Sequence, residues 1–261
     1  MSRIQFDEMK ATIKQAFLNA GMPDDKADIC AQIHTESSRD GVYSHGLNRV
    51  ERFVEYIGKG WVDVNAVPSL ELNLGALEVF NGNLGPGITN AIFAMNRATE
   101  IAGQNGLGLV SLNNTTHWMR GGAYGWLAAE KGFIGICWTN TESCMPAWGA
   151  KSGGIGNNPF IMAVPRKEGH IVLDMAMSQY SYGKLQVTRL KNEKLPFAGG
   201  FDQALSETIE QLKSSVPEKE NGEIFYPGEQ SLKTRHQNME LGIPVDDGVW
   251  AKVKELARLK Y

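Results

Sequence analysis

Two histidines lie in segments whose neighbouring side chains could take part in acid–base chemistry. The first belongs to Tyr43-Ser44-His45-Gly46 and is followed four residues later by Arg49. Residues four apart share one face of a helix, so His45 and Arg49 are predicted to project together. The guanidinium could hold a substrate carboxylate in a fork, while the imidazole exchanges a proton with a neighbouring carbonyl oxygen. The alternative is a helix-capping histidine beside an arginine in a surface ion pair.

The second histidine, His117, lies in a polar loop that directly follows a predicted strand and precedes two consecutive glycines. Polar loops at strand ends are where ligands collect, and glycines let a backbone approach closely. A buried loop histidine satisfied by hydrogen bonds is the alternative. Structural roles are expected for the side chains of the three remaining histidines, which are His34, His170 and His236.

The composition excludes several classes of protein. The chain has 261 residues, of which 26 are basic and 29 acidic, giving a net charge of −3. A nucleic-acid-binding protein would normally show a basic excess, and no apolar run reaches the roughly 20 residues of a membrane helix. The N-terminus has no signal-peptide core, and three cysteines are too few for a disulfide framework or a zinc cluster. We therefore expect a cytoplasmic enzyme with no metal site.

The two histidines must be positioned by a helical part and a sheet. Residues 1–66 show apolar residues at helical spacing and predict an N-terminal helical part. Residues 67–200 alternate strand and helix patterns and predict a central sheet covered by helices. Residues 201–261 are more polar, with helices expected at 201–216 and 249–259 that pack back on the N-terminal helices. The fold class predicted is α+β.

The motifs of several common sites are absent. A Rossmann fold should carry G-x-G-x-x-G between a strand and a helix, but the nearest matches, beginning at Gly85 and Gly106, lack the third glycine. The sequence also contains no G-x-x-x-x-G-K-[ST], no G-x-S-x-G and no H-E-x-x-H. Phosphate-loop, serine-hydrolase and metalloprotease sites are therefore not expected.

Several motifs occur together in the order known from one enzyme family. They are YSHG, THWMRGG, GFIGICWTN, PAWGAK, GNNP and LDMAMSQYSYGKL. On these motifs the chain resembles the malate/L-lactate dehydrogenase family of NAD(P)-dependent oxidoreductases, over roughly residues 3–202 and again near Pro227. The resemblance implies a non-Rossmann, nicotinamide-binding domain with a mixed sheet, a helical domain formed from the N- and C-terminal segments, and a homodimer.

The resemblance also implies roles for individual residues. His45 is expected to be the proton donor, Arg49 its partner, and His117 a second histidine of the substrate pocket. Cofactor contacts are expected from seven consecutive residues, mostly through their backbone, and from four residues elsewhere. These residues are His170, Ile171, Val172, Leu173, Asp174, Met175 and Ala176, together with Thr141, Gly228, Glu229 and Gln230.

The activity that the resemblance implies is reduction of the 2-keto group of a small keto acid by NADH or NADPH, with NADH preferred. The first candidate reaction converts 2,3-diketo-L-gulonate to 3-dehydro-L-gulonate. Malate, lactate, ureidoglycolate and a cyclic imino acid are alternative substrates for a dehydrogenase of the same family.

One family segment is missing from the sequence. After Asp202 the family continues for several tens of residues that include a Trp-Lys-Gly-Ser-Gly motif contacting the cofactor, and no such motif occurs here. Either the chain is a shortened, non-catalytic homologue that serves as a binding or dimer-partner protein, or the sequence joins two stretches of a longer chain. Loss of a packed segment would be strongly destabilising, which favours the second interpretation. A Pro-Gly-Glu-Gln turn at 227–230, in place of Pro-Gly-His-Glu, leaves the cofactor preference open.

Overall fold

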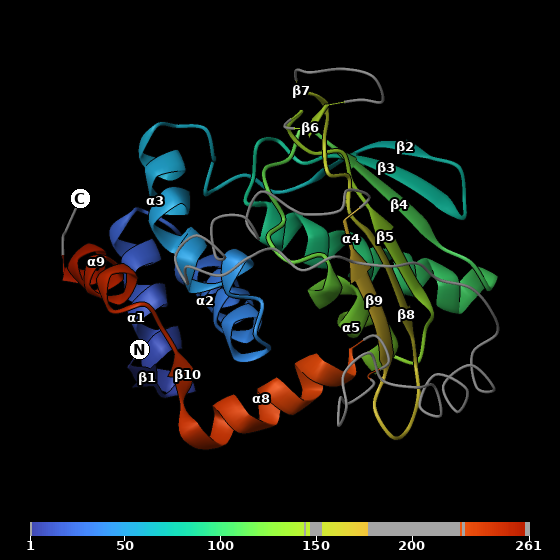
Figure 1. Ribbon diagram of the computed structural model, residues 1–261. Helices are drawn as coiled ribbons and strands as arrows, with labels where there is room; N and C mark the ends of the chain where they lie inside the picture. Colours follow the sequence, from blue (N-terminus) through green and yellow to red (C-terminus); the bar gives the residue numbers. More distant parts are fainter. Residues whose placement is uncertain (1, 144, 147–152, 177–224, 226–227, 259–261) are drawn as a thin grey trace.

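A helical part and a sheet domain lie side by side in the computed structural model, which describes residues 2–143, 145–146, 153–176, 225 and 228–258 (Figure 1). The helices are α1 (Phe6–Asn19), α2 (Asp24–Arg39), α3 (Val50–Gly58), α4 (Gly87–Asn105), α5 (Gly122–Glu130), α8 (Glu229–Leu241) and α9 (Asp247–Arg258), with 3-10 turns η1 (Tyr43–His45) and η2 (Leu47–Arg49). The strands are β1 (Arg3–Ile4), β2 (Ser69–Asn73), β3 (Leu77–Asn81), β4 (Leu109–Asn113), β5 (Gly135–Trp138), β6 (Met145–Pro146), β7 (Gly153–Ile155), β8 (Phe160–Val164), β9 (Ile171–Met175) and β10 (Ile243–Pro244). The predicted α+β class is confirmed.

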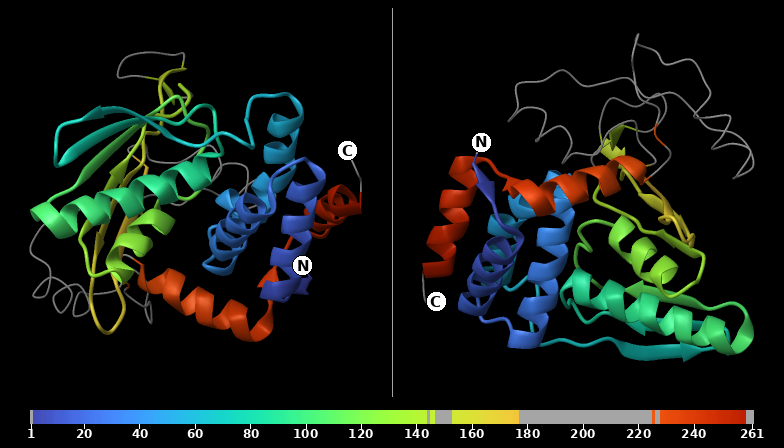
Figure 2. Two further views of the ribbon diagram at one scale, coloured as in Figure 1. Left: turned by 180° about the vertical axis from the view of Figure 1, so that it is seen from behind. Right: turned by 90° about the horizontal axis from the view of Figure 1, so that it is seen from below.

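The helical part is assembled from both ends of the chain. Helix α1 packs against α2 on one side and against α9 on the other, and the views in Figure 2 show α9 beside α1. Strands β1 and β10 form an antiparallel pair in which Ile4 lies opposite Ile243. Both of these side chains belong to one buried apolar cluster that also contains residues of α1, α2, α3 and α9. This cluster therefore holds the first and last described segments in one core.

The sheet domain contains two three-stranded sheets. In one, β2 pairs antiparallel with β3 and β3 pairs parallel with β4. In the other, β8 lies between β5 and β9, with both pairs antiparallel. Helices α4 and α5 pack on these sheets and lie on one side of them (Figure 2). The buried side chains of β5, β8 and β9, such as Cys137, Ile161 and Val172, form a second apolar cluster with residues of α5.

Helix α8 connects the sheet domain to the helical part (Figure 1). Its N-cap, Gly228, has φ +92°, and a Cβ built there would lie 3.3 Å from the backbone nitrogen of Val172. Asn238 is the buried residue of α8, and its amide donates to the carbonyl oxygen of Arg39. The sequence did not predict α8, because it has no apolar stripe. The helix predicted at 201–216 lies outside the described residues. No helix in the described part of the chain is long and apolar enough to cross a membrane.

The pairing of the two ends can be tested at β10. Replacing Ile243, whose side chain is fully buried, by alanine should lower the free energy of unfolding by about 2–5 kcal/mol. The matched control is Leu241→Ala, because Leu241 is 50% exposed and exposed positions change stability by no more than about 0.5 kcal/mol. Urea denaturation followed by circular dichroism measures both; equal midpoints for the two variants would contradict the packing described for β10.

Candidate active site

The segment that carries His45 is not one continuous α-helix, so the predicted shared helical face of His45 and Arg49 is wrong. The turns η1 and η2 are separated by Gly46, which has φ −105° and ψ −128°. A Cβ at Gly46 would lie 2.1 Å from Ser38 Oγ and 2.9 Å from His34 O. The close packing of this glycine on α2 breaks the helical path, and regular helix begins at Val50.

Two side chains of α2 hold the backbone beside His45. His34 Nδ1 donates to Gly46 O at 3.0 Å, since a carbonyl oxygen can only accept. Ser38 Oγ accepts from Leu47 N–H at 2.8 Å. Burial lowers the pKa of His34 to about 4, so its ring is neutral at pH 7. The side chain of His34 therefore acts on the position of the His45 segment through a backbone contact.

The structure brings His45 and His117 together from segments far apart in the sequence. Their rings are stacked, with centroids 5.9 Å apart and an angle of 28° between the planes. His45 Nδ1 is 2.9 Å from Ser44 Oγ. His45 comes from the helical part and His117 from the loop after β4, so the pair lies where the two parts of the molecule meet.

The orientation of His117 is set by its own loop. The backbone N–H of Met119 donates to His117 Nδ1 at 2.8 Å. Because an N–H can only donate, Nδ1 is unprotonated and the neutral ring carries its proton on Nε2. The loop also rests on the start of α4, where a Cβ at Gly87 would lie 2.1 Å from Thr116 O and 2.5 Å from His117 O. His117 is thus presented as a hydrogen-bond donor through Nε2.

Both histidines are neutral at pH 7. Burial, followed by the charges of His117, Arg49 and Arg120, lowers the pKa of His45 to about 3. Removal from water, followed by the charge of Arg49, lowers the pKa of His117 to about 4. A positive field of this kind disfavours imidazolium and favours an anionic ligand.

Arg49 is oriented by the same short segment. Its Nε donates to the carbonyl oxygen of Ser44 at 3.0 Å. Burial and the neighbouring Arg52 lower its pKa, although an arginine remains charged in a protein. Its two terminal amino groups make no hydrogen bond within the described residues. They are therefore available to bind a carboxylate in a bidentate fashion.

Two of the predicted cofactor segments lie against each other. The predicted stretch from His170 to Ala176 contains β9, and Gly228 approaches the backbone of Val172 in this strand. Among the described residues β9 is paired only with β8. The backbone N–H and C=O groups of every second residue of β9 therefore point away from β8. Glu229 and exposed Gln230 form the first residues of α8, whose N-terminus favours anions.

The remaining predicted cofactor residues have mainly structural contacts. Thr141 Oγ1 donates to Asn157 Oδ1 at 2.6 Å, and the Thr141 N–H donates to Asn158 Oδ1 at 3.0 Å. His170 Nδ1 accepts from the Arg166 N–H at 3.2 Å, and its ring lies 5.6 Å from that of Trp126. The backbone groups of β9 that do not pair with β8, and the glycine turn at Gly228, are groups that could hydrogen-bond a nicotinamide cofactor. Within the described residues, no group of three or more His, Cys, Asp or Glu could hold a metal ion.

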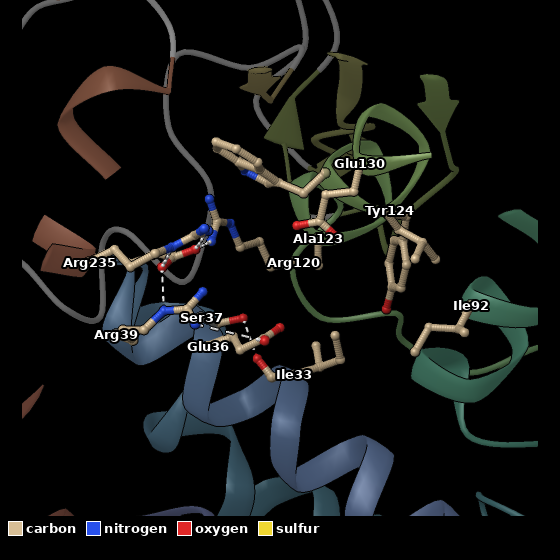
Figure 3. A pocket seen from close by; sticks show the side chains of 13 residues that line it. Ile33, Glu36, Ser37, Arg39, Ile92, Arg120, Ala123, Tyr124, Glu130 and Arg235 are labelled. Atoms are coloured by element: carbon tan, nitrogen blue, oxygen red, sulfur yellow. Dashed lines mark hydrogen bonds and ion pairs between the residues drawn. The ribbon is translucent and has the colours of Figure 1, made fainter. Parts of the chain in front are cut away.

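A buried ion-pair network, which we call the Asp40 network, was missed by sequence reasoning. The Asp40 carboxylate contacts Arg120 at 2.7 Å, Arg235 at 2.6 Å and Arg39 at 2.9 Å, and Arg39, Arg120 and Arg235 converge in Figure 3. They line a cavity of about 300 Å³ between α2 and α5. The one sequence feature that could have pointed to this network is the position of Arg120, three residues after His117.

With this geometry established, comparison with known proteins identifies the family. The malate/L-lactate dehydrogenase family model matches residues 4–204. A 2,3-diketo-L-gulonate reductase of Shigella boydii serotype 4 (strain Sb227) is 46% identical over 200 residues, which is 77% of this chain and 60% of the relative. A protein of the same name from Escherichia coli (strain K12 / DH10B) is 45% identical over 200 residues. The chain belongs to the malate/L-lactate dehydrogenase family, and it spans 60% of the length of these relatives.

Solved structures share the fold at lower sequence identity. Malate dehydrogenase from Pyrococcus horikoshii OT3 superposes with a TM-score of 0.87 at 24% identity, covering 98% of this chain and 95% of that one. Sulfolactate dehydrogenase from Methanocaldococcus jannaschii gives a TM-score of 0.85 at 22% identity, covering 98% and 96% of the two chains. These likenesses establish the fold.

The neutral state of the two histidines predicts a pH response. Nitrogen-15 NMR of the ligand-free protein should show no protonation of His45 or His117 between about pH 5 and pH 8, because their pKa values lie near 3 and 4. Their folded pKa values are below the unfolded value of about 6.5, so the stability they contribute is present above that pH and is lost as the pH falls towards 4. The urea-unfolded protein provides the control. A midpoint near 6.5 in the folded protein would contradict the field described here.

Proposed function

We propose that the protein is an NADH-dependent reductase of the 2-keto group of a small keto acid, with 2,3-diketo-L-gulonate as the first substrate to test. The observation that carries the proposal is the stacked His45–His117 pair together with Arg49, whose terminal amino groups make no hydrogen bond to any residue that the structure describes. The similarity to 2,3-diketo-L-gulonate reductases over 200 residues supports this substrate.

The three side chains divide the work by their hydrogen-bonding capacity. Arg49 binds the substrate carboxylate in a fork, which fixes the neighbouring keto group. His117 donates its Nε2–H to the keto oxygen, because its Nδ1 is occupied by the Met119 N–H. His45, once it has taken a proton from solvent to become imidazolium, donates that proton to the reduced oxygen and returns to its neutral form. A bound dihydronicotinamide would supply the hydride, held by backbone groups of β9 and the turn at Gly228.

Substrate binding adjusts the pKa of His45 in the direction that the reduction needs. In the ligand-free site, burial first and then positive neighbours including Arg49 hold this pKa near 3. A carboxylate paired with Arg49 places a negative charge in the site and so raises the pKa of His45. In the reverse, oxidative direction, the neutral imidazole is already the form that accepts a proton. The same charge balance thus couples carboxylate binding to proton transfer.

The substrate can be assigned by a panel. Within the family, malate, lactate, ureidoglycolate and a cyclic imino acid are the alternatives. All but the last carry the carboxylate-and-oxygen pair that Arg49 and His117 would recognise, so the pocket geometry alone selects a class of substrate. Initial rates separate the candidates when each compound is paired with the cofactor form that its oxidation state requires. Malate, lactate and ureidoglycolate are assayed with NAD+ and NADP+, and 2,3-diketo-L-gulonate and the cyclic imino acid with NADH and NADPH.

A second candidate function is supported by the missing Trp-Lys-Gly-Ser-Gly motif. A chain without this cofactor contact could serve as a non-catalytic binding or dimer-partner protein. Calorimetry with NADH distinguishes the two functions, because only the reductase requires the cofactor to bind.

The reductase function predicts the effect of replacing His45. His45→Gln should lower kcat by at least about 100-fold, the usual contribution of general acid–base catalysis, while NADH binding measured by calorimetry is unchanged. The control is His236→Gln, because His236 is exposed on α8 and should retain full activity. Unchanged turnover in His45→Gln would remove His45 from the mechanism, whereas a wild-type protein that binds no NADH would favour the non-catalytic function.

We also propose a homodimer formed through the outer face of the β5-β8-β9 sheet. Ile136 and Met162 are cross-strand neighbours on this face, and Trp138 and Met175 both lie opposite Phe160 of β8, one on each side of it. All four are exposed, and Trp138 is 61% exposed. An apolar face of this extent is typical of an interaction surface.

Light scattering tests the dimer. The wild-type mass should be twice the chain mass of 28.7 kDa, and Trp138→Lys should return the mass to that of one chain, because a charge on the face opposes its burial. Trp61→Lys is the matched control, since Trp61 is 55% exposed at the end of α3. A dimer that survives Trp138→Lys would place the interface elsewhere.

A further inference from the structure

An ion pair joins the two segments that carry the active-site histidines. Arg120 lies three residues after His117 and Asp40 five residues before His45. Arg120 Nη1 is 2.7 Å from Asp40 Oδ2, and the Arg120 side chain is only 5% exposed. Because both partners are buried, this contact is shielded from water and opposes separation of the two segments.

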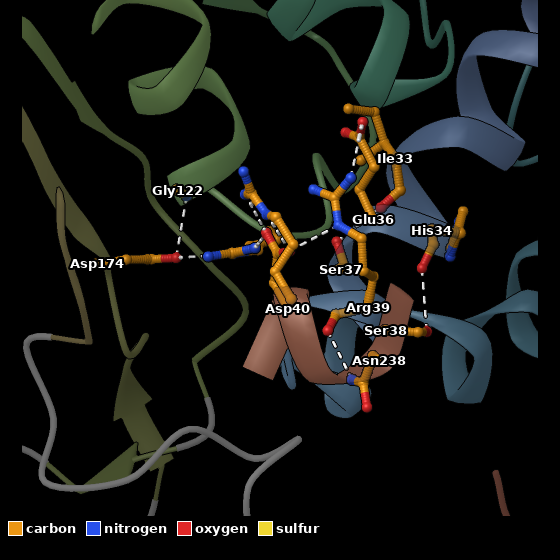
Figure 4. A network of polar contacts seen from close by, with 12 residues as sticks. Ile33, His34, Glu36, Ser37, Ser38, Arg39, Asp40, Gly122, Asp174 and Asn238 are labelled. Carbon is orange, nitrogen blue, oxygen red and sulfur yellow. Dashed lines mark hydrogen bonds and ion pairs between the residues drawn. The ribbon is translucent and has the colours of Figure 1, made fainter. Parts of the chain in front are cut away.

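The same guanidinium also faces the predicted cofactor strand. Arg120 Nε is 3.7 Å from Asp174 Oδ2, the oxygen that accepts the N–H of Gly122 at 3.0 Å. Figure 4 shows Asp40 and Asp174 joined by one chain of contacts. A planar guanidinium can meet two carboxylates at once, whereas the single ammonium of a lysine cannot do so with the same geometry. Arg120 is therefore held by its hydrogen bond to Asp40, with the longer ion pair to Asp174 on the other side of the guanidinium.

Between Arg120 and His117 lies a residue in a rarely occupied conformation. Met119 has φ +62°, in the left-handed region that L-residues seldom adopt. Its side chain is buried in the apolar cluster of the helical part, and its N–H points at His117 Nδ1. Such a conformation persists where its surroundings over-determine it. Here the buried Met119 side chain and the anchored Arg120 provide that constraint.

We propose that Arg120 is a positioning residue, which acts through Met119 to keep His117 in the Nε2–H tautomer and stacked on His45. The catalytic consequence rests on the proposed reductase function, but the tautomer and the stacking are properties of the ligand-free protein. Without the anchor, Met119 relaxes out of the left-handed region, its N–H leaves Nδ1, and both neutral tautomers of His117 become populated.

The test compares Arg120→Lys and Arg120→Met with the wild type. Asp40 keeps Arg39 and Arg235 in both variants, so its carboxylate stays paired. Nitrogen-15 shifts should show wild-type His117 with an unprotonated Nδ1, a partial change in Arg120→Lys and a mixture of tautomers in Arg120→Met. For the keto acid substrate, kcat should fall about 100-fold in Arg120→Met, as expected for a misplaced catalytic group, with a much smaller change in KM.

Arg97→Met is the control, because Arg97 forms an ion pair of the same length, 2.7 Å, with buried Glu78 in another part of the sheet domain, although its own side chain is 37% exposed. It should lose stability but keep the wild-type His117 shifts and kcat. A folded Arg120→Lys or Arg120→Met protein with unchanged shifts overturns the proposal, as does a wild-type spectrum with the proton on His117 Nδ1. If the wild type reduces no keto acid, the reductase function fails while the tautomer measurement still decides the role of Arg120.

Discussion

The carboxylate of Asp40 is the group on which the arrangement of the site depends. It is 3% exposed and contacts arginines from α2, from the loop before α5 and from α8. Burial would raise its pKa, but the arginines reverse that effect and lower the pKa to about 2. A buried charge is tolerated only when it is paired, and loss of a partner leaves an uncompensated ion. The network thus fixes the helical part, the sheet domain and α8 relative to one another at a single point.

Burial first, and then the positive charges around the site, keep the two histidines neutral. Three arginines share Asp40, whereas Arg49 has no carboxylate partner among the described residues. Arg49 and Arg120 both lower the pKa of His45. A site with this excess of positive charge is complementary to an anion, and in the proposed function binding of that anion raises the pKa of His45. Recognition and acid–base chemistry consequently depend on the same electrostatic field.

Much of the secondary structure could be predicted from local patterns, whereas the assembly of the site could not. Helical spacing predicted the helices of residues 1–66 and the helix at 249–259, where α1, α2, α3 and α9 lie. The strand-and-helix pattern of residues 67–200 predicted the central sheet covered by helices. Helix α8 was not predicted, because its buried residue is the polar Asn238 and it therefore shows no apolar stripe. Its position depends on contacts with Asp40 and Arg39, which lie nearly two hundred residues earlier in the sequence. The spacing of His45 and Arg49 predicted a shared helical face that the structure does not have, because the packing of Gly46 on Ser38 interrupts the helix. The pairing of His45 with His117 could be inferred only from the family resemblance, since no local pattern records a contact between distant loops.

The missing family motif bears on the cofactor rather than on the acid–base residues. His45, Arg49 and His117 all lie within the stretch of residues 4–204 that matches the family, and their geometry is set by α2, η1, η2 and the loop after β4. The motif, by the resemblance, contacts the nicotinamide cofactor. Its loss would therefore weaken cofactor binding while leaving the stacked histidines and the Asp40 network in place. An intact acid–base pair is thus compatible with either candidate function, and cofactor affinity is the property that distinguishes them.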